Sequence, residues 1–166
     1  MKHSLLLIFA LLLGWNIQAQ VPNGTITYKN YLSLPAYSLF DLNNKPLLTT
    51  SVPQKGKSLV IVYFSPSCGH CQEFTSNLTA RLKDFKKVQF LYVSAYPLAD
   101  IQKFTTDRGL QKMTNFTIAH DPEFKLGTFF AMKELPSVFV YGSNGKLKGN
   151  FDSKLTIDEL VLMANE

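Results

Sequence analysis

The sequence predicts an α/β domain in which a central mixed β-sheet is flanked by helices. Two apolar runs rich in β-branched and aromatic residues, Ser58–Phe64 and Val88–Ser94, are typical of strands buried on both faces. A stretch with helical periodicity follows each run, and the chain ends in a hairpin and a closing helix. Strand, helix, strand, helix and then a hairpin is the order of a mixed sheet covered by helices.

The first half of the chain begins with a predicted strand over Tyr37–Leu42 and a turn over Asn43–Pro46. The buried strand Ser58–Phe64 comes next. A helix is then predicted from Gly69 to about Lys86, because apolar side chains recur at helical spacing, namely Phe74, Leu78, Leu82 and Phe85.

In the second half, the strand Val88–Ser94 precedes a helix over Leu98–Arg108 that Gly109 ends. Phe116–Ala119 is predicted to be a strand. Asp121-Pro122 provides an N-cap and first position for a short helix that reaches Phe129 or Phe130.

The last elements are two strands and a helix. Ser137–Tyr141 and Lys146–Phe151 are joined by Gly142–Gly145, whose Asn-Gly pair is typical of a hairpin turn. Thr156–Asn165 is predicted to be a helix that starts with a capping box, since Glu159 stands three residues after Thr156.

Residues 1–19 have the three regions of a secretory signal peptide. Lys2 supplies the positive start, Leu5–Leu13 is an unbroken apolar core, and Ile17–Ala19 ends in a small residue. A membrane anchor is disfavoured, because this core is well short of the roughly 20 apolar residues that span a bilayer. We therefore expect a signal peptide over residues 1–19, a lead-in segment over 20–35 and one domain over 36–166, in a soluble periplasmic or secreted protein with no stable membrane anchor.

The chain carries 17 Lys and Arg against 12 Asp and Glu, a net charge of +5 with neutral His. The basic residues are scattered and form no stripe. This charge indicates solubility and argues against a nucleic-acid partner.

Cys68-Gly69-His70-Cys71 contains both cysteines of the chain and lies directly after a predicted strand, at the start of a predicted helix. The first sulfur is therefore expected at a helix N-terminus, where free N–H groups and the helix dipole favour the thiolate over the thiol. This is the chemistry of reversible thiol–disulfide exchange.

Two other uses of the cysteines are disfavoured. A zinc site would need ligands from His3, His70 and His120, but His3 leaves with the signal peptide and His70 lies between the two cysteines, so a second ligand pair is missing. A structural disulfide would close so short a loop that it would stabilise the fold only weakly. We expect redox activity that uses neither metal nor cofactor.

The element order, with Cys-x-x-Cys after the first central strand and a proline before the hairpin, resembles the thioredoxin fold over roughly residues 33–166. Tyr63–Cys71 is similar to the active-site segment of protein disulfide isomerases, including Pro66 two residues before the first cysteine. Leu34–Pro46 is more similar to the N-terminal hairpin of the exported bacterial TlpA/ResA group. Leu135-Pro136-Ser137 and Asn144-Gly145-Lys146 correspond to the cis-proline loop and the following hairpin of that group.

The resemblance implies a thiol-disulfide oxidoreductase that acts on protein thiols and disulfides and has an unidentified redox partner protein. Cys68, at the exposed helix start, would be the nucleophile, and the more buried Cys71 would resolve the mixed disulfide. The Leu135-Pro136 bond would be cis, face the cysteines and pair with an incoming peptide. Pro66 and Gly69 would support the motif.

The direction of electron flow stays open at this point. Protonated His70 would stabilise the Cys68 thiolate and make the disulfide more oxidising. The Gly-His dipeptide is that of disulfide isomerases, whose reduction potentials are about −180 mV. It therefore suggests an oxidant or isomerase. The TlpA/ResA resemblance suggests a reductant.

Two positions depart from the thioredoxin pattern. Ser67 replaces the usual tryptophan before the first cysteine, and Val62 stands where an acidic residue commonly helps to deprotonate the second cysteine. Glu73 is the nearest acid in sequence, but its helical position is expected to face solvent.

Two rival functions share this fold. Peroxiredoxins have a Pro-x-x-x-Thr/Ser-x-x-Cys pattern, in which Ser65 fits the hydroxyl position but Ile61 stands where the proline belongs. The other rival is a non-enzymatic binding module in which the cysteines serve only as a clip.

Overall fold

The computed structural model describes residues 33–166, so the predicted signal peptide and most of the lead-in segment lie outside the described residues. Seven strands form one sheet in the order β2-β1-β5-β4-β3-β6-β7. The strands are β1 (Ser38–Phe40), β2 (Pro46–Leu48), β3 (Ser58–Tyr63), β4 (Val88–Ser94), β5 (Phe116–His120), β6 (Ser137–Tyr141) and β7 (Leu147–Phe151). Strands β3, β4 and β5 run parallel and the outer pairs are antiparallel, which confirms the predicted mixed sheet.

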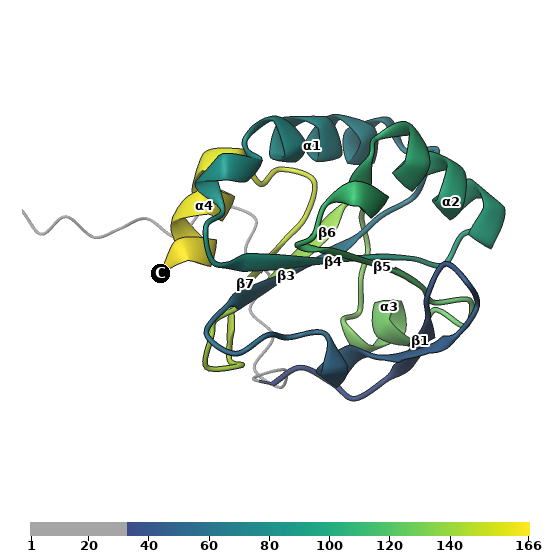
Figure 1. Cartoon of the computed structure of the whole chain (residues 1–166), viewed down its shortest axis with the longest axis horizontal. Coiled ribbons are helices and arrows are strands. Elements are labelled where there is room, and N and C mark those ends of the chain that lie inside the picture. The colour runs from purple at the N-terminus through teal and green to yellow at the C-terminus, as the bar shows by residue number, and fades with distance from the viewer. Residues whose placement is uncertain (1–32) are drawn as a thin grey trace, which may run out of the picture.

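The helices cover the two faces of the sheet unequally (Figure 1). Helices α1 (Gly69–Ala80), α2 (Leu98–Asp107) and α4 (Ile157–Asn165) lie on one face, and the short helix α3 (Lys125–Phe129) lies on the other. Three 3₁₀ turns complete the fold: η1 (Thr49–Ser51), η2 (Leu82–Asp84) and η3 (Leu110–Lys112). The sheet therefore separates two hydrophobic cores.

Every residue of β3 and of β4 is buried, because both strands are central and covered on both faces. Alternate residues of β3 point to opposite sides. Val60 and Val62 pack in the core under α1, whereas Ile61 and Tyr63 pack in the core toward α3. This double burial explains why the sequence shows continuous apolar runs here.

Helix α1 ends at Ala80, so the prediction of a helix to about Lys86 is wrong at its C-terminal end. Arg81 leaves the helical conformation, with φ −105° and ψ 14°, and its guanidinium forms ion pairs with Asp84 and Asp158. After the turn η2, the Phe85 ring packs edge-on against Phe90 of β4, with centroids 5.2 Å apart. The chain turns early because Phe85 has to enter the core beside the start of β4.

Asp121-Pro122 does not start the short helix, which begins four residues later, at Lys125. The Asp121 carboxylate is buried and accepts hydrogen bonds from the backbone N–H groups of Lys125 and Leu126 at 2.9 Å. Phe124 takes a left-handed conformation with φ 54°. Asp121 still caps this helix with its side chain, but across a loop and not from the N-cap position.

Strand β2 is absent from the sequence-based prediction, which assigned Pro46 to a turn. Residues 46–48 pair with β1 after a turn in which Asn44 has a positive φ of 59°. The predicted capping box of α4 is confirmed, because the Thr156 hydroxyl accepts from Glu159 N–H while the Glu159 carboxylate accepts from Thr156 N–H.

Candidate active site

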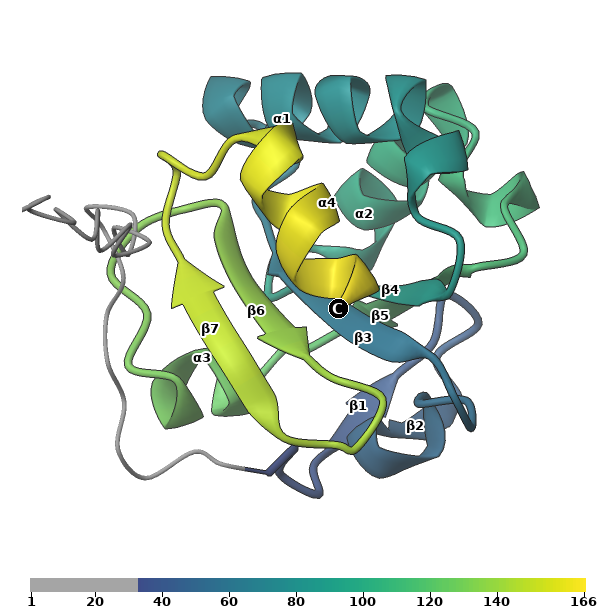
Figure 2. The same ribbon diagram turned by 90° about the vertical axis from the view of Figure 1, so that its left-hand side faces the viewer.

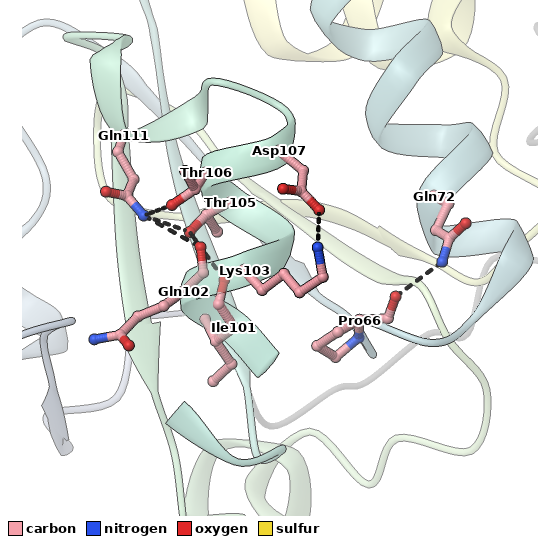
Figure 3. A network of polar contacts seen from close by, with 9 residues as sticks. All are labelled: Pro66, Gln72, Ile101, Gln102, Lys103, Thr105, Thr106, Asp107 and Gln111. Atoms are coloured by element: carbon pink, nitrogen blue, oxygen red, sulfur yellow. Dashed lines mark hydrogen bonds and ion pairs between the residues drawn. The ribbon is translucent and has the colours of Figure 1, made fainter. Parts of the chain in front are cut away.

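Cys68 is the N-cap residue of α1, at the end of the loop that leaves β3. Its side chain is half-buried, and the free N–H groups of the first helical turn lie next to it. The loop is tied to the helix, because Gln72 Nε2 donates a 2.9 Å hydrogen bond to the Pro66 carbonyl (Figure 3). The Cys68 N–H also donates to the Ser65 carbonyl at 3.2 Å. Strand, loop and helix together therefore hold the first sulfur at the helix N-terminus, as predicted.

Cys71 lies one turn further along α1 and is fully buried in the core beneath that helix. Burial raises the pKa of the Cys71 thiol to about 12, because the thiolate loses its hydration there. A hydrogen bond from the Ser65 backbone partly offsets this effect, and the neighbouring Cys68 adds to it. Both cysteines are free thiols in the structure.

The Leu135-Pro136 peptide bond is cis, which confirms what the resemblance implied for this loop. Cys68 Sγ lies 3.8 Å from the Leu135 carbonyl oxygen, toward which it donates. Pro136 is buried, and the next residue, Ser137, opens β6 opposite Tyr63 of β3. The sheet register therefore brings two segments together that are 67 residues apart in the chain.

Gly69 and His70 are both exposed at the start of α1. A Cβ at Gly69 would meet no atom within 4 Å, so the glycine leaves open space beside Cys68. His70 lines a hollow of about 510 Å³ between α1 and residues 153–158. Glu73 lines the same hollow and is exposed, as predicted.

A second hollow, of about 330 Å³, lies on the α2 side of the cysteine loop. Pro66, Ser67 and Gln72 form one wall, and residues of α2 with Tyr96 form the other. Figure 3 shows the Lys103–Asp107 ion pair on this side of α2, with nitrogen and oxygen 2.8 Å apart. The loop that carries Cys68 is thus flanked by an open surface on each side.

In the described part of the chain, no carboxylate takes the place of the acid that is missing at Val62. Asp121 is the one buried carboxylate among residues 33–166, and it accepts from the Tyr63 hydroxyl at 3.0 Å. Tyr63 packs in the core on the α3 side, whereas Val62 and Cys71 pack in the core on the α1 side. The sheet therefore separates Asp121 from the cysteines.

The polar groups near Cys71 are two hydroxyls that the sequence analysis missed. Thr75 Oγ1 donates a 2.7 Å hydrogen bond to the Cys71 carbonyl, and the Tyr92 hydroxyl donates to Thr75 Oγ1 at 3.4 Å. The spacing of four between Cys71 and Thr75 is a signal that the sequence does contain. The approach of Tyr92 depends on strand pairing and has no local signal.

Within residues 33–166, no group of three or more His, Cys, Asp or Glu side chains could hold a metal ion. No helix in this part of the chain is both long enough and apolar enough to cross a membrane.

The sequence pattern of the AhpC/TSA family matches residues 33–149. A comparison with curated protein sequences finds no match. Among solved structures, a secreted Mycobacterium tuberculosis disulfide oxidoreductase homologous to E. coli DsbE is similar, with a TM-score of 0.65, 19% identity, and coverage of 78% of this chain and 95% of that one.

Two further M. tuberculosis structures are similar to this chain. DsbF has a TM-score of 0.62 at 18% identity and covers 78% of this chain and 93% of its own. The peroxidoxin BcpB has a TM-score of 0.67 at 13% identity, and the match covers 80% of this chain and 94% of BcpB. At these identities the likeness shows a shared thioredoxin-like fold. The family pattern spans most of the chain, and this protein therefore belongs to the AhpC/TSA family.

Proposed function

We propose that this protein is an extracytoplasmic thiol-disulfide oxidoreductase of the TlpA/ResA type, which exchanges disulfides with protein thiols through Cys68 and Cys71. The observation that carries the proposal is the asymmetry of the two sulfurs. Cys68 is accessible at a helix start beside the cis-proline loop, and Cys71 is buried one turn away with a raised pKa. An attacking and a resolving cysteine need this division.

In the reducing direction, the Cys68 thiolate attacks one sulfur of a substrate disulfide and displaces the other as a thiolate. The mixed disulfide is then attacked by Cys71, which loses its proton, bonds to Cys68 Sγ and releases the second substrate sulfur. The substrate gains two electrons and the two cysteines lose two. A redox partner protein restores the dithiol by the reverse exchange.

The cis-proline loop offers a place for the substrate backbone. The Leu135 carbonyl already lies 3.8 Å from Cys68 Sγ, so an extended peptide that bonds to Cys68 passes directly beside this loop. Such a peptide could pair with backbone groups at Leu135 and Pro136 as a short added strand. The neighbouring Gly69 is exposed, and the space around its Cα is open.

The reduction potential of the Cys68–Cys71 couple tests the proposal and its direction together. A potential of about −270 mV, like that of thioredoxin, indicates a reductant. A potential of about −180 mV indicates an oxidant or isomerase. A value below about −300 mV, with no turnover of a protein disulfide such as that of insulin, would overturn the proposal in favour of a structural clip in a binding module. We expect His70→Ala to lower the potential if protonated His70 stabilises the Cys68 thiolate.

A thiol peroxidase is the second candidate, and both the AhpC/TSA family match and the likeness to BcpB favour it. Against it, Ile61 occupies the position of the peroxidase proline and is fully buried within β3. The Ser65 hydroxyl, at the other pattern position, is engaged with the Ser67 hydroxyl at 3.2 Å. Peroxide consumption by the reduced protein separates the two functions, and we expect little.

A further inference from the structure

Resolution of a mixed disulfide requires Cys71 to lose a proton from a site that contains no carboxylate. Cys71 is fully buried, and its thiol has a pKa of about 12. The resolving step therefore needs other groups that favour the thiolate as it forms. This requirement rests on the proposed exchange function.

The sheet register places a tyrosine beside the position that lacks an acid. Val62 of β3 pairs directly with Tyr92 of β4, and both side chains lie in the core on the α1 side, with Cys71. Tyr92 is fully buried. Its hydroxyl is thus a polar group inside the largely apolar layer beneath the active-site helix.

The Tyr92 hydroxyl is connected to Cys71 by a chain of hydrogen bonds. It donates to Thr75 Oγ1 at 3.4 Å, and Thr75 Oγ1 donates to the Cys71 carbonyl at 2.7 Å. Burial raises the pKa of Tyr92, and the nearby negative charge of the Cys71 thiolate raises it further. Tyr92 therefore stays protonated and remains a donor at every pH where exchange occurs.

We propose that Tyr92 and Thr75 are positioning residues, whose hydroxyls hold Cys71 through its carbonyl for attack on Cys68 and place polar groups near its thiolate. In the step that they assist, the bond between Cys68 Sγ and the substrate sulfur breaks and the Cys68–Cys71 disulfide forms. The Cys71 proton passes to the released thiolate or to solvent.

Few other charged or titratable groups face this site. Cys68 lies at the start of the same helix, and Arg108 follows the end of α2, where its positive charge lowers the pKa of Tyr92. The Arg108 Nε is buried with no hydrogen-bond partner among the described residues, and its guanidinium lies 4.1 Å from the Phe104 ring centroid. The other packed elements contribute apolar side chains, namely Val62 of β3, Val138 of β6 and Leu160 of α4.

Reaction of the reduced protein with dithionitrobenzoate separates the two cysteine steps. The first thionitrobenzoate is released when Cys68 attacks the reagent, and the second when Cys71 attacks the resulting mixed disulfide. We expect Tyr92→Phe to slow the second release roughly tenfold at pH 7, and to shift its pH profile upward, because the helical turn that holds Cys71 loses a supporting hydrogen bond and the thiolate loses a nearby hydroxyl dipole. The first release should not change.

Tyr141→Phe is the matched control, because Tyr141 is buried in the core on the α3 side and its hydroxyl has no hydrogen-bond partner in the described part of the chain. Thr75→Val should slow the second release as Tyr92→Phe does, and Thr75→Ser, which keeps the hydroxyl, should restore it. This second pair decides the question if Tyr92→Phe does not fold.

The outcomes are distinguishable. If the wild-type protein releases only one thionitrobenzoate, Cys71 does not resolve, and the exchange function fails together with this inference. If both releases occur but Tyr92→Phe and Thr75→Val match Tyr141→Phe at every pH, the exchange function stands and the role of the two hydroxyls is refuted.

Discussion

Cys68 and Cys71 are separated by one helical turn, yet their sulfurs have different surroundings. Cys68 precedes the first turn of α1, where backbone N–H groups are free and solvent can reach the side chain. Cys71 points from the first turn into the core, where its thiolate would lose hydration. The same pair of residue types therefore supplies one reactive and one protected thiol.

Alkylation of the native, reduced protein tests this difference. At pH 8, iodoacetamide should modify Cys68 and spare Cys71, because a thiol with a pKa of about 12 is thiolate in only about 1 molecule in 10⁴. Labelling of Cys71 should rise as the pH approaches 12. Peptide mass spectrometry reads both sites, and the denatured protein, which should be labelled at both, is the control. Rapid labelling of Cys71 at pH 8 would contradict the assignment.

Substitution of each cysteine tests their roles in exchange. Cys71→Ser should accumulate mixed disulfides with substrate proteins, because no thiol remains to resolve them, whereas Cys68→Ser should trap few or none. Non-reducing electrophoresis of cell extracts, after acid quenching of free thiols, measures the trapped species. Equal trapping by both variants would show that the roles are assigned wrongly, even if the redox function is right.

At the scale of elements, the site depends on where β3 ends. Tyr63 pairs with Ser137, the residue after the cis-proline, so the loop that leaves β3 and the loop that enters β6 emerge at the same edge of the sheet. Five residues separate the end of β3 from the start of α1, which puts the helix N-terminus at that edge. Cys68 therefore faces Leu135 because of strand pairing.

The buried carboxylate of Asp121 has a structural role on the other face of the sheet. It accepts hydrogen bonds from the Tyr63 hydroxyl and from two N–H groups of α3. Asp121→Ala leaves these donors unpaired, so we expect the free energy of unfolding to fall by about 3 kcal/mol in urea denaturation. Tyr63→Phe, which removes one donor, should cost about 1.5 kcal/mol.

Cysteine alkylation of the Asp121→Ala protein is the control for this stability measurement. Because the sheet separates Asp121 from Cys71, the alkylation pattern of the folded Asp121→Ala protein should equal that of the wild type. A loss below about 1 kcal/mol would mean that the three hydrogen bonds contribute little.

In the whole molecule, the helices α1, α2 and α4 cover one face of the sheet and the shorter α3 covers the other. The C-terminal helix α4 lies beside α1 (Figure 2). The Arg81 guanidinium bonds to Asp158 at 2.8 Å, and Asn165 Nδ2 donates to the Asp84 carbonyl at 2.8 Å. These contacts join the end of α1 to the start of α4, and the turn η2 to the end of α4. At the opposite end of α1, Gly69 and His70 are exposed and Cys68 is half-buried, whereas Cys71 is buried.

Export is the prediction that concerns the full chain. The charged start, apolar core and small residue at Ala19 predict that the mature protein begins at Gln20 and is found in the soluble extracytoplasmic fraction. Mass spectrometry of the native protein measures its N-terminus. An intact Met1, or retention in membranes after a carbonate wash, would argue against export.

Local patterns in the sequence were sufficient for much of this fold. The bounds of β4 and β6 and the start of α1 were predicted correctly, because continuous burial and helical spacing leave their mark on neighbouring residues. The Cys68–Cys71 pair was evident because its two cysteines lie within four consecutive residues. The cis bond before Pro136 followed from a family resemblance and not from local pattern.

The tertiary structure alone decided which distant residues meet. The displaced start of α3 depends on a contact between residues far apart in the chain, because Asp121 bonds to the Tyr63 hydroxyl. Strand β2 depends on its pairing with β1, and the early end of α1 goes with the packing of Phe85 against Phe90. The pairing of Val62 with Tyr92 is of the same kind. Strand order and register are set by the packing of the whole chain, so a residue carries no local sign of its partner on another strand. That is why the sequence identified the two sulfurs, but only the folded sheet revealed that the Tyr92 hydroxyl reaches the helical turn of the second one.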